Sequence, residues 1–195
     1  MALWSSPATH ARATRAATHP TAPDLYILIT NPDPATFCEP SLRVVHAYWS
    51  ERCIDASLPA RRDIDPFALR RFLPRLMLVD VKKGPDFVYR LVGTEIVDDR
   101  GFEPTGKRVA DVFPAHLAES VLAPYRLTHE HGQPVYDPQG WPDRRPCLNP
   151  DHTLFLPLAS DGKRIDMILV YSVRPRGRTH GHDTVAGDRI AVLDR

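Results

Sequence analysis

The chain has 195 residues, of which 43% are hydrophobic and 25% charged, an ordinary composition for one globular domain with appendages. Its net charge of +1 gives no global field that would draw it onto nucleic acid, and no apolar run is long enough to span a membrane. Three widely spaced cysteines argue against a disulfide framework and favour a cytoplasmic location.

The two ends of the chain are predicted to lie outside the folded domain. Residues 1–40 are expected to form a disordered leader, and residues 176–195 a flexible tail without periodicity. Residues 1–23 contain arginine, serine, threonine and alanine but no acidic residue, a composition that also resembles a transit peptide. The simpler interpretation is a disordered leader, which leaves residues 41–175 as the domain.

The domain is expected to begin with an amphipathic helix over residues 42–53, capped by Ser41. Leu42, Val45 and Trp49 have the spacing i, i+3, i+7, which places them on one stripe of the helix. Such a stripe must be covered either by the domain itself or by another chain. We expect a homodimer whose interface is formed by Leu42, Val45, Tyr48 and Trp49.

An arginine-rich segment follows. Asp65 before Pro66 predicts the start of a short helix over residues 67–72, which ends before Pro74 because proline cannot continue it. The segment suggests a basic face, for which the favoured interpretation is a solvated helix surface. The arginines concerned are Arg61, Arg62, Arg70, Arg71 and Arg75.

The remaining elements alternate between strands and helices. Two β-rich runs separated by Gly84-Pro85 predict an antiparallel hairpin, a helix kinked at Pro124 is expected to end at Gly132, and an Asp-Gly turn precedes the last strand. Strands in two groups around a helical stretch predict an α+β domain with an antiparallel sheet. The predicted strands are residues 76–81, 87–94, 134–136, 153–158 and 165–173.

Short sequence motifs lie within and between these elements along the whole predicted domain. They are Tyr48-Trp49, the Pro-x-Arg-x-Asp-Ile-Asp-Pro of residues 59–66, the Leu-Pro-x-Leu of residues 73–76, the Tyr-Arg-Leu-Val-Gly-Thr of residues 89–94, the Thr-Gly-Lys of residues 105–107, the Leu-Pro-Leu of residues 156–158 and the Ser-Asp-Gly of residues 160–162.

In this series the chain resembles a family of bacterial stand-alone PAS-like domains, over about residues 42–173. The resemblance implies a PAS fold: a five-stranded antiparallel sheet with short helices on one face and an amphipathic helix before it. It also implies a sensory or signalling role, and it brings with it no settled ligand and no catalytic residues.

A small apolar ligand is expected between the sheet and its helices, if the Tyr89 face of the second strand points inward. Arg90 could clamp an anionic ligand, but an ion pair with Asp80 on the neighbouring strand is the preferred interpretation. The predicted pocket residues are Tyr89, Arg90, Leu91, Tyr125, Leu156 and Met167.

No cofactor, metal site or catalytic site is evident. His116 and His129 are the candidate haem ligands, for which exposed polar residues are the favoured interpretation, and the cysteine segment of flavin-binding PAS domains is missing. No metal-binding spacing and no nucleophile elbow occur, so we expect no enzyme. The predicted function is PAS-type sensing through ligand- or partner-dependent protein interaction, with a separate signalling protein as output. The alternative is a ligand-free PAS-like adaptor or dimerisation module.

Overall fold

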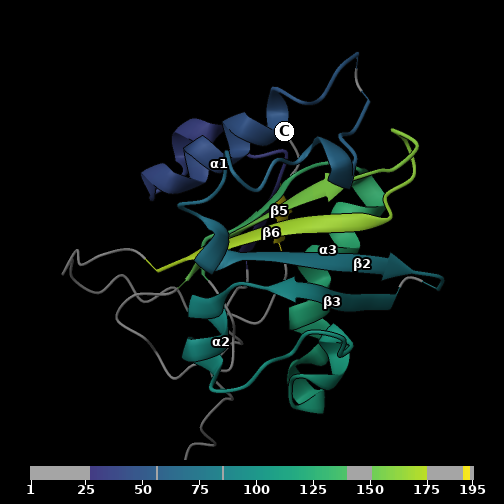
Figure 1. Cartoon of the computed structure of the whole chain (residues 1–195). Coiled ribbons are helices and arrows are strands. Elements are labelled where there is room, and N and C mark those ends of the chain that lie inside the picture. Colours follow the sequence, from purple (N-terminus) through teal and green to yellow (C-terminus); the bar gives the residue numbers. More distant parts are fainter. Residues whose placement is uncertain (1–26, 56, 85, 140–150, 175–190, 194–195) are drawn as a thin grey trace, which may run out of the picture.

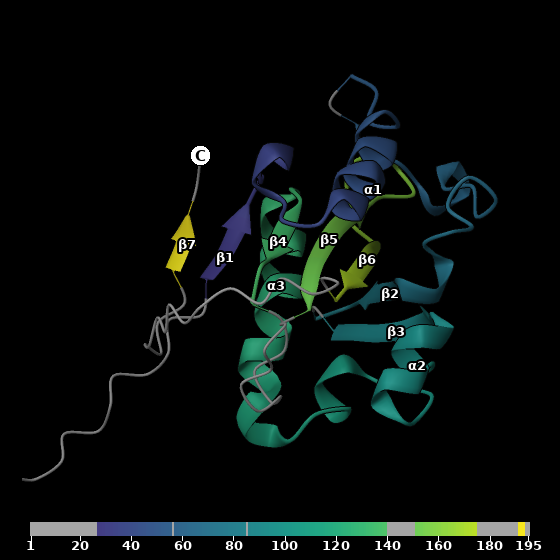
Figure 2. The same cartoon turned by 90° about the vertical axis from the view of Figure 1, so that its left-hand side faces the viewer.

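The computed structural model describes residues 27–55, 57–84, 86–139, 151–174 and 191–193. Within these residues the strands form one seven-stranded sheet of order β3-β2-β6-β5-β4-β1-β7, as Figures 1 and 2 show. All neighbours are antiparallel except β1 and β7, which are parallel. The strands are β1 (Ile27–Thr30), β2 (Leu76–Lys82), β3 (Asp86–Val92), β4 (Val135–Asp137), β5 (His152–Leu158), β6 (Met167–Val173) and β7 (Ala191–Leu193).

Helices cover both faces of this sheet (Figure 1). The helix α1 (Pro40–Ser50) lies on one face, while α2 (Thr94–Arg100) and α3 (Ala118–His131) lie on the other. The expected α+β PAS fold is confirmed, and each of the five predicted strands is present within a few residues of its expected bounds. The short 3₁₀ turns are η1 (Pro34–Thr36), η2 (Arg61–Asp63), η3 (Leu73–Arg75), η4 (Val109–Asp111) and η5 (Ala115–Leu117).

The central strands are buried on both faces of the sheet. Their sequences are therefore continuous runs of apolar residues, without alternating polar positions. In β5, Leu154 and Leu156 belong to the cluster beneath α1, whereas Phe155 between them belongs to the cluster beneath α3. Every residue of this strand is buried. The sheet therefore separates two apolar cores, one on each face.

The predicted leader and tail each contribute a strand to the sheet. Leu28 in β1 is fully buried, and β1 pairs with β4, so the folded domain begins before residue 41. The strand β7 in the predicted tail lies parallel to β1. Sequence patterning misses both because these short strands lie in segments whose aperiodic composition is typical of disordered chain ends. Residues 1–26 of the predicted leader, and residues 175–190 and 194–195 at the other end, lie outside the described residues.

Two local predictions are wrong. The helix α1 begins at Pro40, and Ser41 does not cap it: the cap position is Glu39, without a side-chain hydrogen bond. Residues 67–72 form successive turns rather than a helix, although the Asp65 carboxylate accepts a hydrogen bond from the Phe67 N–H at 2.8 Å, as in a cap. The Arg70 N–H donates to the Phe67 carbonyl at 3.3 Å and the Phe72 N–H to the Leu69 carbonyl at 2.8 Å, and this three-residue spacing belongs to tight turns, not to an α-helix.

Candidate functional site

The apolar stripe of α1 is covered by the chain's own sheet. Leu42 and Val45 are fully buried and Trp49 is 6% exposed. The Trp49 Nε1–H donates a hydrogen bond to the carbonyl of Pro157 in β5 at 2.9 Å. Tyr48 lies at the edge of this contact, where its hydroxyl accepts a hydrogen bond from the Asp65 N–H at 2.7 Å. The stripe therefore cannot be the predicted dimer interface, and the homodimer itself stays a prediction.

The six predicted pocket residues do not line one site. Tyr89 and Tyr125 are buried beneath α3, but Leu156 and Met167 belong to the opposite core beneath α1. Arg90 and Leu91 are exposed. The six residues therefore cannot line the one pocket that the sequence predicts, because the two tyrosines share one core while Leu156 and Met167 share the other.

A β-bulge in β3 explains why Arg90 and Leu91 are exposed. Leu78 of β2 pairs with Leu91 and the next residue, Val79, pairs with Tyr89, so Arg90 is an extra residue in the ladder. The bulge reverses the alternation, which turns Leu91 outward to 45% exposure. Arg90 lies 3.5 Å from the Asp80 carboxylate, which confirms the expected ion pair.

A polar cluster lies inside the core beneath α3, next to the two tyrosines. Arg100, the last residue of α2, extends its guanidinium to 5.2 Å from the centre of the Tyr89 ring and 5.6 Å from that of Phe113. Its Nη2 lies 3.8 Å from the sulfur of Met77. Arg100 is absent from the sequence-based prediction, because an arginine in the last turn before the helix-ending Gly101 is typical of any helix C-terminus.

The buried hydroxyls of Tyr89 and Tyr125 contact each other, and that of Tyr89 also contacts Arg100, but neither hydroxyl makes a hydrogen bond of normal geometry. Burial raises the pKa of Tyr89, although the nearby Arg100 charge opposes the shift, and burial raises the pKa of Tyr125 well above its usual range. Both hydroxyls therefore stay protonated and can donate. A buried polar group with no partner at all costs about 1–3 kcal/mol, and these poorly aligned contacts offset only part of that cost.

An ion-pair network connects this cluster to the end of β6. Asp99, the neighbour of Arg100, lies 2.8 Å from Arg75 and 3.6 Å from Arg174, the residue after β6. Arg75 also pairs with Glu95 at 2.6 Å, and Arg174 pairs with the buried Asp151 at 2.9 Å. These ion pairs therefore link α2 to the residue that follows β6.

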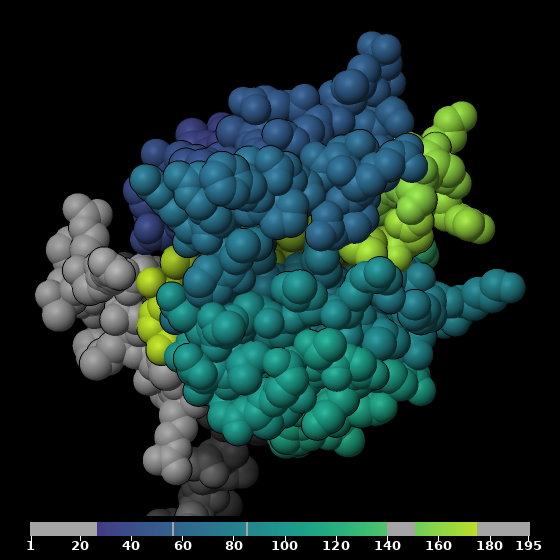
Figure 3. Space-filling view, in the orientation of Figure 1, coloured from purple at the N-terminus to yellow at the C-terminus, as the bar shows by residue number. Residues whose placement is uncertain are grey.

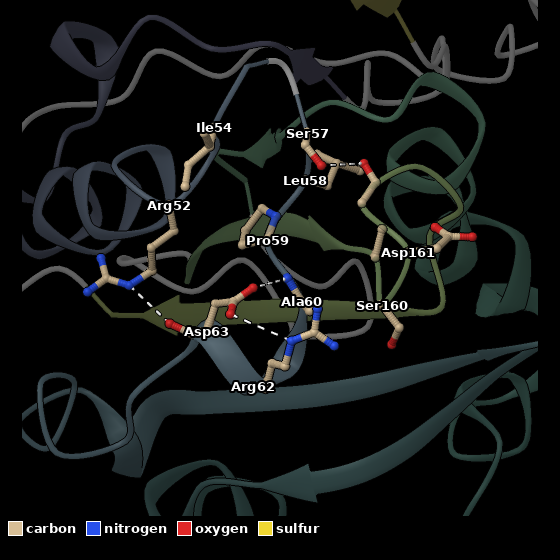
Figure 4. Close-up of a pocket in the computed structure, with 12 residues that line it drawn as sticks. Arg52, Ile54, Ser57, Leu58, Pro59, Ala60, Arg62, Asp63, Ser160 and Asp161 are labelled. Carbon is tan, nitrogen blue, oxygen red and sulfur yellow. Dashed lines mark hydrogen bonds and ion pairs between the residues drawn. The ribbon is translucent and has the colours of Figure 1, made fainter.

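An open pocket of about 390 Å³ lies on the α1 side of the sheet, away from the tyrosine cluster (Figure 4). Its polar groups serve the local fold: the Asp63 carboxylate accepts from the Ala60 N–H at 2.8 Å, and the Ser57 hydroxyl donates to the Gly162 carbonyl at 3.2 Å. Asp63 belongs to the Pro-x-Arg-x-Asp-Ile-Asp-Pro segment of residues 59–66. Both aspartates of this segment accept backbone hydrogen bonds that hold turns. Because these polar groups already bond to the chain's own backbone, we assign the pocket a role in the fold and not in ligand binding.

The residues considered as haem or metal ligands do not form a site. His116 is exposed and His129 is half-buried on α3. Within the described parts of the chain, no three histidine, cysteine or acidic side chains are grouped so that they could hold a metal ion. A helix long and apolar enough to cross a membrane does not occur there either.

The family of the chain follows from its match to one family model. The sequence model of a family described as PAS domain matches residues 37–169. No curated protein matches. One solved structure, described as an RNA-binding Light-Oxygen-Voltage receptor, is 16% identical with a TM-score of 0.36, and the match covers 60% of this chain but only 36% of that one. The family match begins before α1, ends within β6 and covers more than half of the chain, and the chain therefore belongs to the PAS domain family.

Proposed function

We propose that the chain is a non-catalytic PAS-type sensory domain that binds a small ligand beside Tyr89, Tyr125 and Arg100 and signals through a separate protein. The observation that carries this proposal is the pair of buried tyrosine hydroxyls without a normal hydrogen bond, next to a guanidinium. A ligand oxygen placed among these groups would accept from both hydroxyls and from the cation.

The surroundings favour an amphipathic ligand. Apolar side chains of the core enclose the two tyrosines, so the body of the ligand would be apolar and one end would carry an acceptor or an acidic group. The Tyr125 ring packs against Phe87 and Phe155, with centroid distances of 5.4 and 5.0 Å. These contacts hold its hydroxyl in place for the ligand.

Loss of the Arg100 charge should remove the ligand. We expect native mass spectrometry of the purified chain to show a co-purified small molecule, and Arg100→Met to lower its occupancy about 10- to 100-fold, the value of one charge-assisted hydrogen bond. Tyr125→Phe should lower it less. The matched control is Arg90→Met, because Arg90 is an exposed arginine on the sheet edge.

Two outcomes contradict the proposal. A molecule that remains fully bound in Arg100→Met would place the ligand elsewhere. A wild-type protein that carries no small molecule would favour the alternative, a ligand-free adaptor with a filled core.

The proposed path of the signal runs from Arg100 through Asp99 to Arg174. Asp99→Asn should leave the ligand bound but increase the rate of amide hydrogen exchange at Val173, because Arg174 then loses one of its two carboxylate partners. Asp98→Asn is the control, since Asp98 is an exposed neighbour on the same helix. Equal exchange in the two variants would show that the network does not stabilise the end of β6.

A further inference from the structure

We propose that the turn of residues 65–73, together with Arg62, docks an acidic segment of a partner protein. Phe67 is the apolar anchor, and Arg62, Arg70 and Arg71 contact the partner's carboxylates. This inference rests on the proposed function, because that function requires a signalling partner. We name these residues the basic turn; they lie on the outer surface formed by residues 45–75 (Figure 3).

Apolar and basic side chains are exposed together on the basic turn. Phe67 is 73% exposed and Leu73 37% exposed. Single exposed apolar residues are common and need no explanation. Here, however, the guanidinium of Arg70 lies 5.0 Å from the centre of the Phe67 ring, and Arg71 is exposed beside it. Aromatic residues and arginine are the types most enriched at the centres of protein interfaces.

The turn holds this arrangement rigidly. Leu69 is 2% exposed and anchors the turn in the core beneath α1. Phe72 packs edge-on against Tyr171 of β6 at 5.6 Å. The Phe67 N–H is bound by the Asp65 carboxylate, and the Asp65 N–H by the hydroxyl of Tyr48. Phe67 is therefore presented to solvent by a fixed backbone, which lowers the entropy cost of binding.

The arginines of the segment divide into two groups. Arg61 donates to the Ile64 carbonyl at 2.9 Å, and Arg75 is engaged by two carboxylates, so both serve the fold. Arg62 lies 3.9 Å from the carboxylate of Asp63, its one ion-pair partner within the described part of the chain, and 76% of its side chain is exposed. Among the described residues, Arg70 and Arg71 form no ion pair with a carboxylate. The exposed group thus leaves positive charge for a partner to neutralise.

Charge complementarity favours an acidic protein segment over other occupants. A second copy in a two-fold dimer would place arginines against arginines, which like-charge repulsion disfavours. Nucleic acid is favoured by longer basic surfaces, whereas this turn offers three arginines in a chain of net charge +1 and adds the apolar Phe67 and Leu73. The turn also ends at η3, whose Arg75 contacts Asp99, so a docked segment lies next to the proposed signal path.

Photo-crosslinking tests the surface in the full-length protein. Phe67→p-benzoylphenylalanine, expressed in the native host and irradiated, should crosslink to one segment of a different protein, identified by mass spectrometry and carrying net negative charge. Arg70→Glu combined with Arg71→Glu should lower the crosslink yield at least tenfold. The matched control is Lys83→Glu with Arg164→Glu, two exposed residues in other turns, which should leave the yield unchanged.

Thermal unfolding of each variant verifies that the fold is retained. A crosslink to nucleic acid, to a second copy of this chain or to a neutral or basic segment would overturn the proposal, as would no crosslink in a folded protein. A specific acidic crosslink in a protein that carries no small molecule would support the docking surface and refute the ligand. The two proposals therefore fail separately.

Discussion

Replacing Trp49 by alanine should lower the free energy of unfolding by about 4 kcal/mol, in the range of buried tryptophan truncations. The substitution empties the space between α1 and β5 and leaves the Pro157 carbonyl without its donor. Sequence patterning alone places this residue in a dimer interface, where the same change would convert a dimer into a monomer. The structure predicts loss of folding stability instead.

Chemical denaturation and sedimentation velocity together decide between these outcomes. Trp49→Phe should cost about 1–2 kcal/mol, because the ring contacts are mostly kept and one hydrogen bond is lost. Val44→Ala is the control on the same helix, since Val44 is 52% exposed, and it should change stability by less than about 0.5 kcal/mol. A Trp49→Ala protein of wild-type stability would contradict the packing of α1 on the sheet.

Gly93→Ala should destabilise the domain by about 3 kcal/mol, the upper range for overpacking in a rigid site. A Cβ at this position would lie 2.4 Å from the carbonyl oxygen of Pro74 and 2.5 Å from that of Leu73. Both are backbone atoms of η3 and cannot rotate away as a side chain would. The Gly93 N–H also donates to the Leu76 carbonyl at 2.8 Å, which fixes the distance between the two segments.

The adjacent Thr94→Ala is the control, because Thr94 is exposed at the start of α2. Gly84→Ala gives a useful contrast: a Cβ there meets open space, and its cost of about 1 kcal/mol would come from the positive φ of 97° alone. Urea midpoints of the three variants should therefore rank with Gly93→Ala lowest. A Gly93→Ala midpoint above that of Gly84→Ala would show that η3 can move.

The sequence predicts the strands because their signal is local. Runs such as residues 76–81 and 165–173 are rich in β-branched and apolar residues, and turns with glycine separate them. The stripe of α1 is equally visible, and its burial is predicted correctly. What covers the stripe is decided by tertiary packing, so amphipathicity could not distinguish the sheet from a second chain.

The candidate site depends on features that lack such a signal. The bulge at Arg90 reverses the inward and outward positions of β3, and nothing in the residues from Phe87 to Val92 marks it. The prediction for Leu156 is wrong for a related reason. Every residue of β5 is buried, so the alternation of apolar and polar residues that would tell one face from the other is missing. Arg100 reaches the core only because α2 is folded back over the sheet.

The strand β1 has a consequence for any shortened form of this protein. It lies between β4 and β7, so removal of the chain through Thr30 would leave the outer backbone groups of β4 without their antiparallel neighbour (Figure 2). An unprotected sheet edge is a template for strand exchange and fibril-like aggregation. Expression vectors that trim the apparent leader should therefore retain Ile27, and a fused reporter is better attached upstream of it.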